Sequence, residues 1–356
     1  MFHDIIYTLK EGAHQHSMID KQKGIISNMD KNTKKLKNLS FLSQISTQPI
    51  ILDNVNKKDR KGPTGVSCQS YGKYWFNLPK GEALFKDFNS DDHLKDLKLA
   101  NELVVNKLCE QINLPCADYE PAKIGEVSGV VTYNILKDNE EFLEIPGEVK
   151  SLENIQDVLL QLQNQGYNVD LDESLANAYK MILLDLLTLH IDRNSGGYKI
   201  VVNNKEKYAK FGKIMDNERC FNLPIFVTKR AFDEHIFGLF DSDKEFNVKA
   251  VVNDFEDRAT GGFLKANYLK IATEFSAYQS RIQACVRFAK SNPQMKETLF
   301  STLSNIDINL AIEQLKAENV VLNDYYQIYT NSILEFMLNQ FKNEIHKQFG
   351  PEPQDS

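Results

Sequence analysis

The sequence predicts an α+β fold of two lobes, a small β-rich lobe with one main helix and a larger, mostly helical lobe. Extended aromatic-rich segments surround a single long helical pattern in the first half, whereas the second half is mainly helical, and no solenoid or propeller repeat is present. A chain of 356 residues, with 42% apolar and 26% charged residues, has ordinary globular composition and is long enough for two lobes.

The small lobe is expected to start with a β-hairpin around the turn-forming sequence Leu78-Pro79-Lys80-Gly81. A helix should follow, capped by Ser90 or Asp91 and stopped by Pro115. The predicted strands are residues 67–76, 83–88, 119–124 and 128–136. This order of two strands, a helix and two strands is that of a kinase-type small lobe.

The large lobe is predicted to consist of helices interrupted by one pair of short strands. The helical segment 173–189 is more uniformly apolar than the others, which is typical of a buried helix. The other predicted helices are residues 152–165, 268–291, 308–318 and 323–349, and the predicted strands are residues 197–203 and 208–215. A further helix is expected near residues 29–42.

Several side chains suit phosphoryl transfer, which needs held phosphates, metal ions on their oxygens and a carboxylate near the nucleophile. Lys86 interrupts a short apolar strand, from which it could reach the α- and β-phosphates of a nucleotide. Glu102 lies sixteen residues later, in the following helix, where it could pair with Lys86. Each residue alone is weak evidence, because strand lysines and helix glutamates are commonly exposed to solvent.

A second group of candidates follows the buried helix, in the loop that begins at His190. Placing Asp192 and Arg193 at the end of a buried helix costs free energy unless their charges are paired or serve a function. Asp192 is the candidate that positions or deprotonates an acceptor hydroxyl, and Arg193 pairs with Asp192 or a nearby carboxylate. A structural salt bridge explains the pair equally well. His190 either braces Asp192 or Asp216 or packs in the core.

Asp216, twenty-four residues after Asp192, is expected to end the second strand of the pair and to bind Mg²⁺. A loop that covers the phosphates is less clearly defined. Ser70-Tyr71-Gly72 is one candidate, with Ser70 and Gly72 near the phosphates, and residues 62–67 are another. Neither segment matches a Walker A or G-x-G-x-x-G motif, and ordinary hairpin turns explain both.

These motifs resemble those of the HipA-like kinases, a bacterial group with a protein-kinase-type fold. The resemblance spans about residues 67–220 and rests on short motifs. They are Lys73-Tyr74-Trp75-Phe76, Leu84-Phe85-Lys86, Asn101-Glu102, Ile112-Asn113-Leu114-Pro115, Asp185-Leu186-Leu187, Asp192-Arg193 and Met215-Asp216-Asn217. The resemblance implies a bilobal protein-kinase-like fold, ATP binding by Lys86, an acceptor-side role for Asp192 and magnesium at Asp216.

The sequence departs from this family at one metal-binding position. Family members carry Asn five residues after the catalytic Asp, where this chain has Gly197, and Asn194 replaces a family-like His. Asn194 or Ser195 could supply an oxygen to the metal instead. The alternatives are weakened catalysis or a pseudokinase that binds nucleotide without transferring phosphate.

The leading functional prediction is an ATP- and Mg²⁺-dependent kinase that phosphorylates Ser or Thr hydroxyls of a protein, including its own segment 217–265. A nucleotide-binding scaffold is the second, and nucleotidyl transfer on the same fold is the third. The predicted boundaries are a basic N-terminal extension (1–46), a kinase N-lobe (47–148), a C-lobe (149–350) and a flexible tail (351–356).

Composition limits the partners and the compartment. The net charge is −7, yet residues 21–62 hold ten Lys or Arg against three Asp, so this segment could dock an acidic partner or be a solvated lead-in. No aromatic residues interleave with these lysines, so nucleic acid is not expected. Five scattered cysteines without C-x-x-C spacing favour a reducing cytoplasm, and no segment is apolar enough to span a membrane.

Overall fold

The computed structural model describes part of the chain, and all of the described residues belong to the unit Leu42–Ser356. They are residues 45–52, 73–88, 95–143, 152–190, 193, 199–221 and 278–350. The predicted helix near residues 29–42 and the predicted tail therefore lie outside them. The domain boundaries stay predictions.

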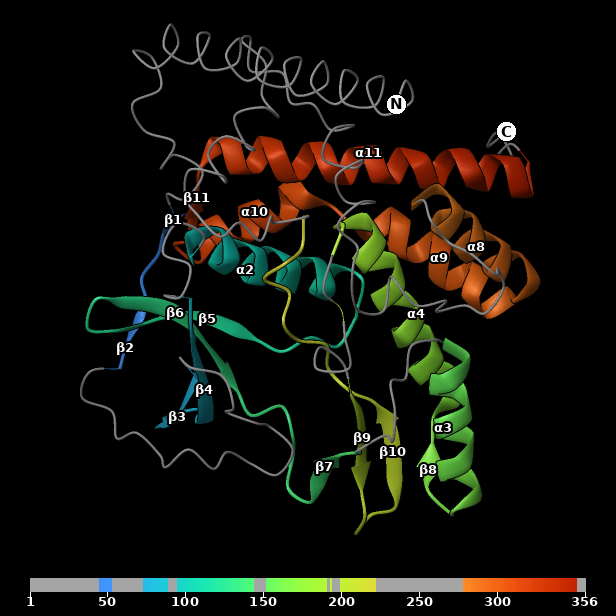
Figure 1. Ribbon diagram of the computed structural model, residues 1–356, viewed down its shortest axis with the longest axis horizontal. Helices are drawn as coiled ribbons and strands as arrows, with labels where there is room; N and C mark the ends of the chain where they lie inside the picture. The colour runs from blue at the N-terminus through green and yellow to red at the C-terminus, as the bar shows by residue number, and fades with distance from the viewer. Residues whose placement is uncertain are drawn as a thin grey trace, which may run out of the picture. The chain divides into compact units, whose positions relative to one another are not determined.

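The first half of this unit is built around a five-stranded sheet in the order β2-β5-β6-β4-β3 (Figure 1). Its pairs are antiparallel except for β2, which runs parallel to β5. The strands are β2 (Ile50–Ile51), β3 (Lys73–Leu78), β4 (Gly81–Asp87), β5 (Tyr119–Ile124) and β6 (Val127–Tyr133). The predicted hairpin and the two later strands are confirmed.

Side chains alternate between the two faces of β4, and this alternation directs Lys86 away from the apolar core of the sheet. Ala83 and Phe85 are fully buried in a core cluster with Phe76 and Val131. Lys86 has the opposite parity and so belongs to the other face. Helix α2 (Lys95–Gln111) packs against β5 and β6.

Helix α2 ends where its sequence predicts. Asn113 adopts a left-handed conformation (φ 51°), and the Leu114 amide donates a hydrogen bond of 2.9 Å to the Cys109 carbonyl. Asparagine tolerates this conformation better than most residues, and Pro115 directly follows, which cannot continue a helix. The predicted stop is confirmed.

The second half combines helices with a four-stranded sheet in the order β7-β9-β10-β8 (Figure 1). Its strands are β7 (Glu140–Phe142), β8 (Asn168–Val169), β9 (Ile200–Asn203) and β10 (Tyr208–Phe211). Helices α3 (Leu152–Asn164) and α4 (Leu171–Leu187) both pack on β10, and α4 also packs on α8, α9 and α11. Helix α4 is therefore surrounded, in agreement with its uniformly apolar sequence.

The C-terminal helices complete this half. They are α8 (Tyr278–Ser291), α9 (Pro293–Asn305), α10 (Ile308–Ala317) and α11 (Asp324–Phe349), and α10 packs against α2. Between them, β11 (Val321–Leu322) pairs with β1 (Ile45–Ser46) near the start of the described chain. Among the described residues, no helix is both long and apolar enough to cross a bilayer.

One predicted strand is wrong at its end. The sequence predicted a strand over residues 208–215 with Asp216 at its end, but β10 stops at Phe211. The amide of Gly212 still donates to the Lys199 carbonyl, and a Cβ at Gly212 would lie only 2.9 Å from that oxygen. The chain then leaves β9, and Ile214 forms a parallel bridge with Cys116 instead. Asp216 therefore lies in an irregular segment that is tied to the end of α2.

Candidate functional site

The candidate site forms where α2 meets the segment after β10. Lys86 Nζ lies 3.2 Å from Glu102 Oε1 on α2. The Lys86 side chain is 13% exposed and that of Glu102 is fully buried. The backbone beneath Lys86 is closely packed, because a Cβ at Gly129 on β6 would lie 2.2 Å from the Lys86 carbonyl oxygen. The lysine is thus held at a fixed place on the sheet.

Two further carboxylates contact the same ammonium group. Asp216 Oδ1 lies 2.8 Å and Glu218 Oε2 lies 2.5 Å from Lys86 Nζ. We call Lys86, Glu102, Asp216 and Glu218 the Lys86 cluster. The cluster brings three carboxylates to one ammonium group, so it carries an excess of negative charge. Such an excess favours the binding of a cation.

Burial and charge compete within the Lys86 cluster. Burial opposes the charge on Lys86, but Asp216, Glu218 and Glu102 together hold its pKa well above the usual value. Burial raises the pKa of Glu102 to about 7, while Lys86 acts in the opposite direction. Lys86 is therefore charged at neutral pH, whereas Glu102 titrates near it.

The backbone of Asp216 is fixed on both sides. Its conformation is left-handed (φ 60°), which is uncommon for a residue other than glycine. Its amide donates to the Tyr119 hydroxyl at 3.1 Å, and His190 Nε2 donates to its carbonyl at 3.1 Å. Burial lowers the pKa of His190 well below its usual value, so this histidine is neutral. His190 thus contacts the backbone of Asp216 and is also buried in the core, so both alternatives from the sequence hold.

Helix α2 also holds the residues that follow Asp216. Glu102 Oε2 accepts a hydrogen bond of 2.9 Å from the Asn217 amide. Asn101 Nδ2 donates to the carbonyls of Glu218 and Cys220 at 2.9 and 2.8 Å. Two neighbouring side chains of α2 therefore position this segment. Asn101 binds its backbone carbonyls, and Glu102 binds the Asn217 amide as well as Lys86.

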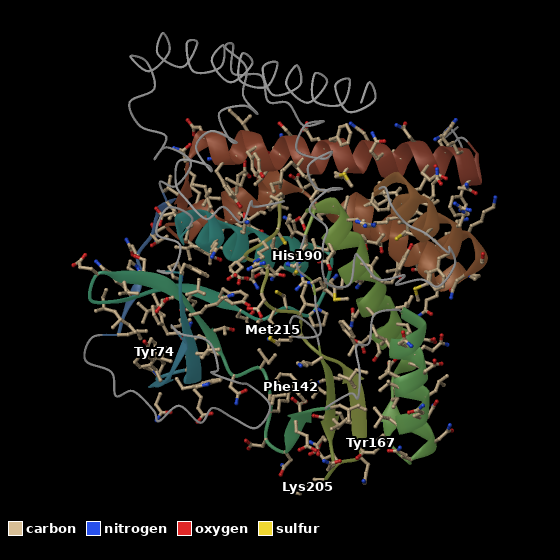
Figure 2. The ribbon with its side chains drawn as sticks, viewed as in Figure 1. Tyr74, Phe142, Tyr167, His190, Lys205 and Met215 are labelled. Carbon is tan, nitrogen blue, oxygen red and sulfur yellow. The ribbon has the colours of Figure 1, made fainter. Side chains whose placement is uncertain are left out.

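Arg193 reaches the same segment from the side of α4. Its guanidinium group forms a bidentate pair with Asp185, at 3.1 Å from Nε to Oδ2 and 2.9 Å from Nη2 to Oδ1. It also donates to the Met215 carbonyl at 2.6 Å and to Asn217 Oδ1 at 2.8 Å. Both charged side chains are fully buried. Figure 2 shows His190 and Met215 close to the centre of the fold, where these contacts gather.

The donor set of the Lys86 cluster fits a magnesium–nucleotide complex. Carboxylate oxygens are the ligands that Mg²⁺ prefers, and it is commonly held by one or two carboxylates together with the phosphates of a substrate. Asp216 is the most accessible of the three carboxylates, with 43% of its side chain exposed. Among the described residues, no three His, Cys, Asp or Glu side chains are arranged to hold a metal by themselves.

Comparison with known proteins identifies the fold that contains this site. No protein-family model and no curated protein sequence matches the chain. Among solved structures, it is similar to the proinflammatory kinase CtkA of Helicobacter pylori, with a TM-score of 0.59 and 13% identity over 86% of this chain and all of that one. The chain therefore shares the fold of this kinase.

A second solved structure is more distant. It is HipA of the Shewanella oneidensis MR-1 toxin–antitoxin system, solved with HipB and operator DNA. The match has a TM-score of 0.39 and 11% identity, and it covers 83% of this chain and 68% of that one. The fold assignment therefore rests on the Helicobacter pylori kinase and not on this match.

The fold brings together three of the residues singled out in the sequence, Lys86, Glu102 and Asp216. Arg193 lies beside them and pairs with Asp185, a nearby carboxylate as the sequence allowed. Ser70, Gly72, Asp192 and Asn194 lie outside the described residues, as does Gly197. The roles of all these residues toward a nucleotide or metal stay predictions.

Sequence reasoning did not assign two residues that the structure brings into the site. Glu218 follows Asp216 by two residues, but no motif marked it as a partner of Lys86. Asp185 was visible as the one acid in an apolar helical run, and a carboxylate buried in this way needs a partner. That signal could have identified Arg193 as its partner.

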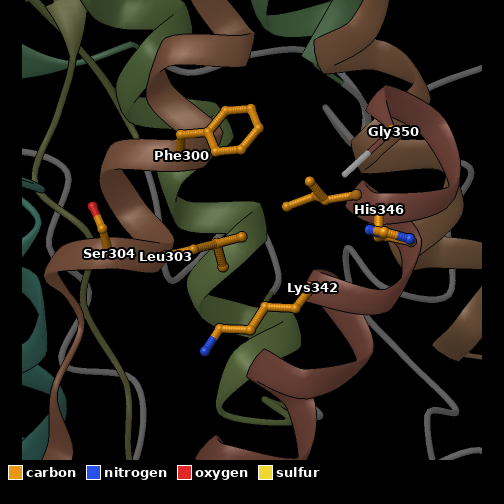
Figure 3. A pocket seen from close by; sticks show the side chains of 7 residues that line it. Phe300, Leu303, Ser304, Lys342, His346 and Gly350 are labelled. Carbon is orange, nitrogen blue, oxygen red and sulfur yellow. The ribbon is translucent and has the colours of Figure 1, made fainter. Parts of the chain in front are cut away.

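A groove elsewhere shares no residue with the Lys86 cluster. It has a volume of about 430 Å³ and lies between α9 and the end of α11 (Figure 3). Its lining residues are Phe300, Leu303, Ser304, Lys342, Ile345, His346 and Gly350. Only Lys342 and His346 bring ionisable groups to this groove, so it lacks the paired carboxylates of the Lys86 cluster.

Proposed function

We propose that the chain is a kinase that transfers the γ-phosphoryl group of ATP to a Ser or Thr hydroxyl of a protein. The observation that carries this proposal is the Lys86 cluster, a buried lysine–glutamate pair with an accessible aspartate on the same ammonium group. It lies in a kinase-type fold, between a strand, a helix and an irregular loop. These are the positions that phosphate binding, lysine orientation and metal binding require in kinases.

The residues of the cluster have separate roles in this proposal. Lys86 binds the α- and β-phosphates, and Glu102 keeps its ammonium group in place. Asp216 holds Mg²⁺ together with Asn194, which follows Asp192 in the chain. Ser70 and Gly72 cover the phosphates. Held by Asp216 and Asn194, Mg²⁺ would supply positive charge that stabilises the phosphates during transfer.

Arg193 and His190 act in this proposal as positioning residues. Both bind backbone carbonyls of the segment that carries Asp216, His190 that of Asp216 itself and Arg193 that of Met215. Asp192 lies between them in the sequence. We assign Asp192 the acceptor-side role of orienting or deprotonating the hydroxyl.

Two alternatives compete with this proposal, both motivated by the sequence. Gly197 stands where HipA-like kinases carry a metal-binding Asn, which favours a nucleotide-binding pseudokinase. Nucleotidyl transfer would use the same cluster with ATP bound in the reverse direction. Gly197→Asn separates kinase from scaffold, because it should raise a slow transfer activity and leave nucleotide affinity nearly unchanged in a scaffold.

The partners and compartment follow from the same proposal. The acceptor is a protein of unknown identity, and segment 217–265 is a candidate for autophosphorylation. The basic segment 21–62 would dock an acidic partner. The cysteines among the described residues are buried thiols, as a reducing cytoplasm allows; they are Cys109, Cys116, Cys220 and Cys285.

Intact-mass spectrometry after incubation with Mg²⁺–ATP tests the proposal. A phosphate-sized gain is expected in the wild type and not in Lys86→Met or Asp192→Ala. Lys80→Met is the matched control, because Lys80 pairs with Glu120 at the exposed end of the same hairpin. An adenylyl-sized gain would instead identify nucleotidyl transfer.

The absence of any gain is informative only with a second measurement. If the protein modifies only a partner, transfer of labelled phosphate to proteins of a cell extract should occur with the wild type and be lost in Lys86→Met. ATP binding without transfer in either assay would support the pseudokinase. No ATP binding at millimolar concentration would contradict the proposed function.

A further inference from the structure

Three carboxylates surround the ammonium group of Lys86. An ammonium group has three donors and no acceptor. Glu102, Asp216 and Glu218 each lie within ion-pair distance of Nζ. A phosphate oxygen can therefore contact Lys86 only after one of these carboxylates has moved.

The three carboxylates differ in how firmly they are held. Glu102 is fully buried, and its second oxygen accepts the Asn217 amide, so it cannot move without disturbing that segment. Asp216 Oδ1 accepts a hydrogen bond from Lys86 at 2.8 Å. Glu218 Oε2 is buried and lies closer, at 2.5 Å, but its contact with Lys86 lacks hydrogen-bond geometry. Glu218 is thus the carboxylate with the poorest contact geometry.

Glu218 also has a second cation to which it can turn. Its other oxygen, Oε1, lies 4.0 Å from Arg219 Nε, and the Arg219 side chain is 31% exposed. A small rotation would exchange the contact with Lys86 for one with Arg219. The displaced carboxylate would therefore remain paired, which keeps the cost of the movement low.

We propose that Glu218 occupies the position on Lys86 that a nucleotide phosphate takes, and that it turns to Arg219 when the nucleotide binds. This inference rests on the proposed role of Lys86 in phosphate binding. Glu218 is then an internal competitor that weakens nucleotide affinity. Its effect is largest on ATP without a divalent cation, because the phosphate charge is then unshielded and adds to the negative charge already in the cluster.

Titration calorimetry with ATP, ADP and adenosine tests this inference, each with Mg²⁺ and with EDTA. Glu218→Gln keeps the size of the side chain and removes its charge. We expect it to bind ATP roughly tenfold more tightly than the wild type in EDTA, which corresponds to about 1.4 kcal/mol. The gain should be smaller with Mg²⁺ and absent for adenosine, which has no phosphate.

A matched control and a second variant make the result specific. Glu120→Gln removes a carboxylate from the exposed pair with Lys80 on the same sheet and should leave all affinities unchanged. Glu218→Ala should reproduce the gain of Glu218→Gln if charge, rather than a new amide contact, is responsible. Thermal unfolding of each variant confirms that the compared proteins are folded.

The outcomes separate the inference from the proposed function. Equal ATP affinity in the wild type and Glu218→Gln would overturn the inference, while the binding itself would still support the function. Weaker ATP binding of the variant with Mg²⁺ alone would also overturn it and would make Glu218 a metal ligand. No ATP binding by either protein would overturn both.

Discussion

Two cations, the largely buried Lys86 and the fully buried Arg193, bind alternate residues of the segment from Met215 to Glu218, and their surroundings differ. Lys86 contacts the side chains of Asp216 and Glu218, together with Glu102. Arg193 binds the Met215 carbonyl and the Asn217 side chain, together with Asp185. Among the described residues, one cation therefore contacts three carboxylates, and the other contacts one carboxylate and two neutral acceptors.

The difference shows which of the two groups is suited to bind a ligand. The Arg193–Asp185 pair is fully buried and balanced in charge, and its guanidinium group is occupied by firm partners. An added ion would therefore gain no favourable charge interaction at the Arg193–Asp185 pair. The Lys86 cluster is unbalanced and includes an aspartate with 43% of its side chain exposed. Structural stability should therefore depend on the first group and nucleotide chemistry on the second.

The largest expected effect is a loss of stability when the Arg193 pair is broken. Asp185→Asn leaves the guanidinium group buried without its counter-charge and should lower the free energy of unfolding by about 3–5 kcal/mol. Urea denaturation followed by circular dichroism measures this loss. The segment from Met215 to Asn217 should lose its fixed position at the same time, so ATP binding should weaken as well.

A double variant and an exposed pair sharpen this prediction. Asp185→Leu combined with Arg193→Met should recover much of the stability, because apolar side chains can replace a buried ion pair. Glu120→Gln, which breaks the exposed pair with Lys80, should have little or no measurable effect. A wild-type unfolding curve for Asp185→Asn would show that the pair is not a structural support.

The second expected effect concerns activity and leaves stability nearly unchanged. Asp216→Asn keeps the shape of the side chain and the backbone contacts but removes the charge proposed to bind Mg²⁺. Phosphoryl transfer should fall by about 10²–10³-fold, the range for removal of one electrostatic group at a reacting centre. Initial rates of phosphate transfer measure this loss, and urea denaturation should give a curve close to that of the wild type.

The comparison with Asp185→Asn decides how this result is interpreted. If Asp216→Asn destabilised the protein as much as Asp185→Asn does, the Lys86 cluster would be a structural support like the Arg193 pair. If it left both transfer and stability unchanged, Asp216 would have no role at the metal. Either result would remove the functional distinction between the two cations.

Much of this arrangement could be predicted from local sequence patterns. Lys86 and Glu102 each lie on an element that a pattern of neighbouring residues defines. Asp216 was identified as a candidate, but the strand predicted to end there stops at Phe211. Helix α9 was missed, although Asn292 and Pro293 are a favourable start for a helix and the Asn292 side chain does cap it. That omission was avoidable.

Other features depend on contacts between distant residues, which no local pattern contains. Strand β1 is two residues long and exists through its pairing with β11, which lies more than 270 residues later. The end of β10 depends on Ile214 joining Cys116 instead of β9. The contact of Glu218 with Lys86 likewise follows from Asn101, which binds the Glu218 carbonyl from a distance of 117 residues.

The smallest expected effect is a dependence of stability on pH that comes from Glu102. Burial raises the pKa of Glu102 from 4.5 to about 7, with Lys86 opposing the shift. The folded state therefore binds more protons than the unfolded state between these values, and stability falls as pH rises through this window. The contribution is full below pH 4.5 and is lost above about pH 7.

Urea denaturation between pH 4.5 and 8 measures this contribution as the difference between the wild type and Glu102→Gln. The difference should change by up to about 3 kcal/mol across the window, because one pKa unit corresponds to 1.36 kcal/mol. Glu120→Gln controls for the loss of a carboxylate at an exposed site. Parallel curves for the wild type and Glu102→Gln would mean that Lys86 keeps Glu102 charged throughout. The two cations would then differ in the number of their partners but not in the protonation of those partners.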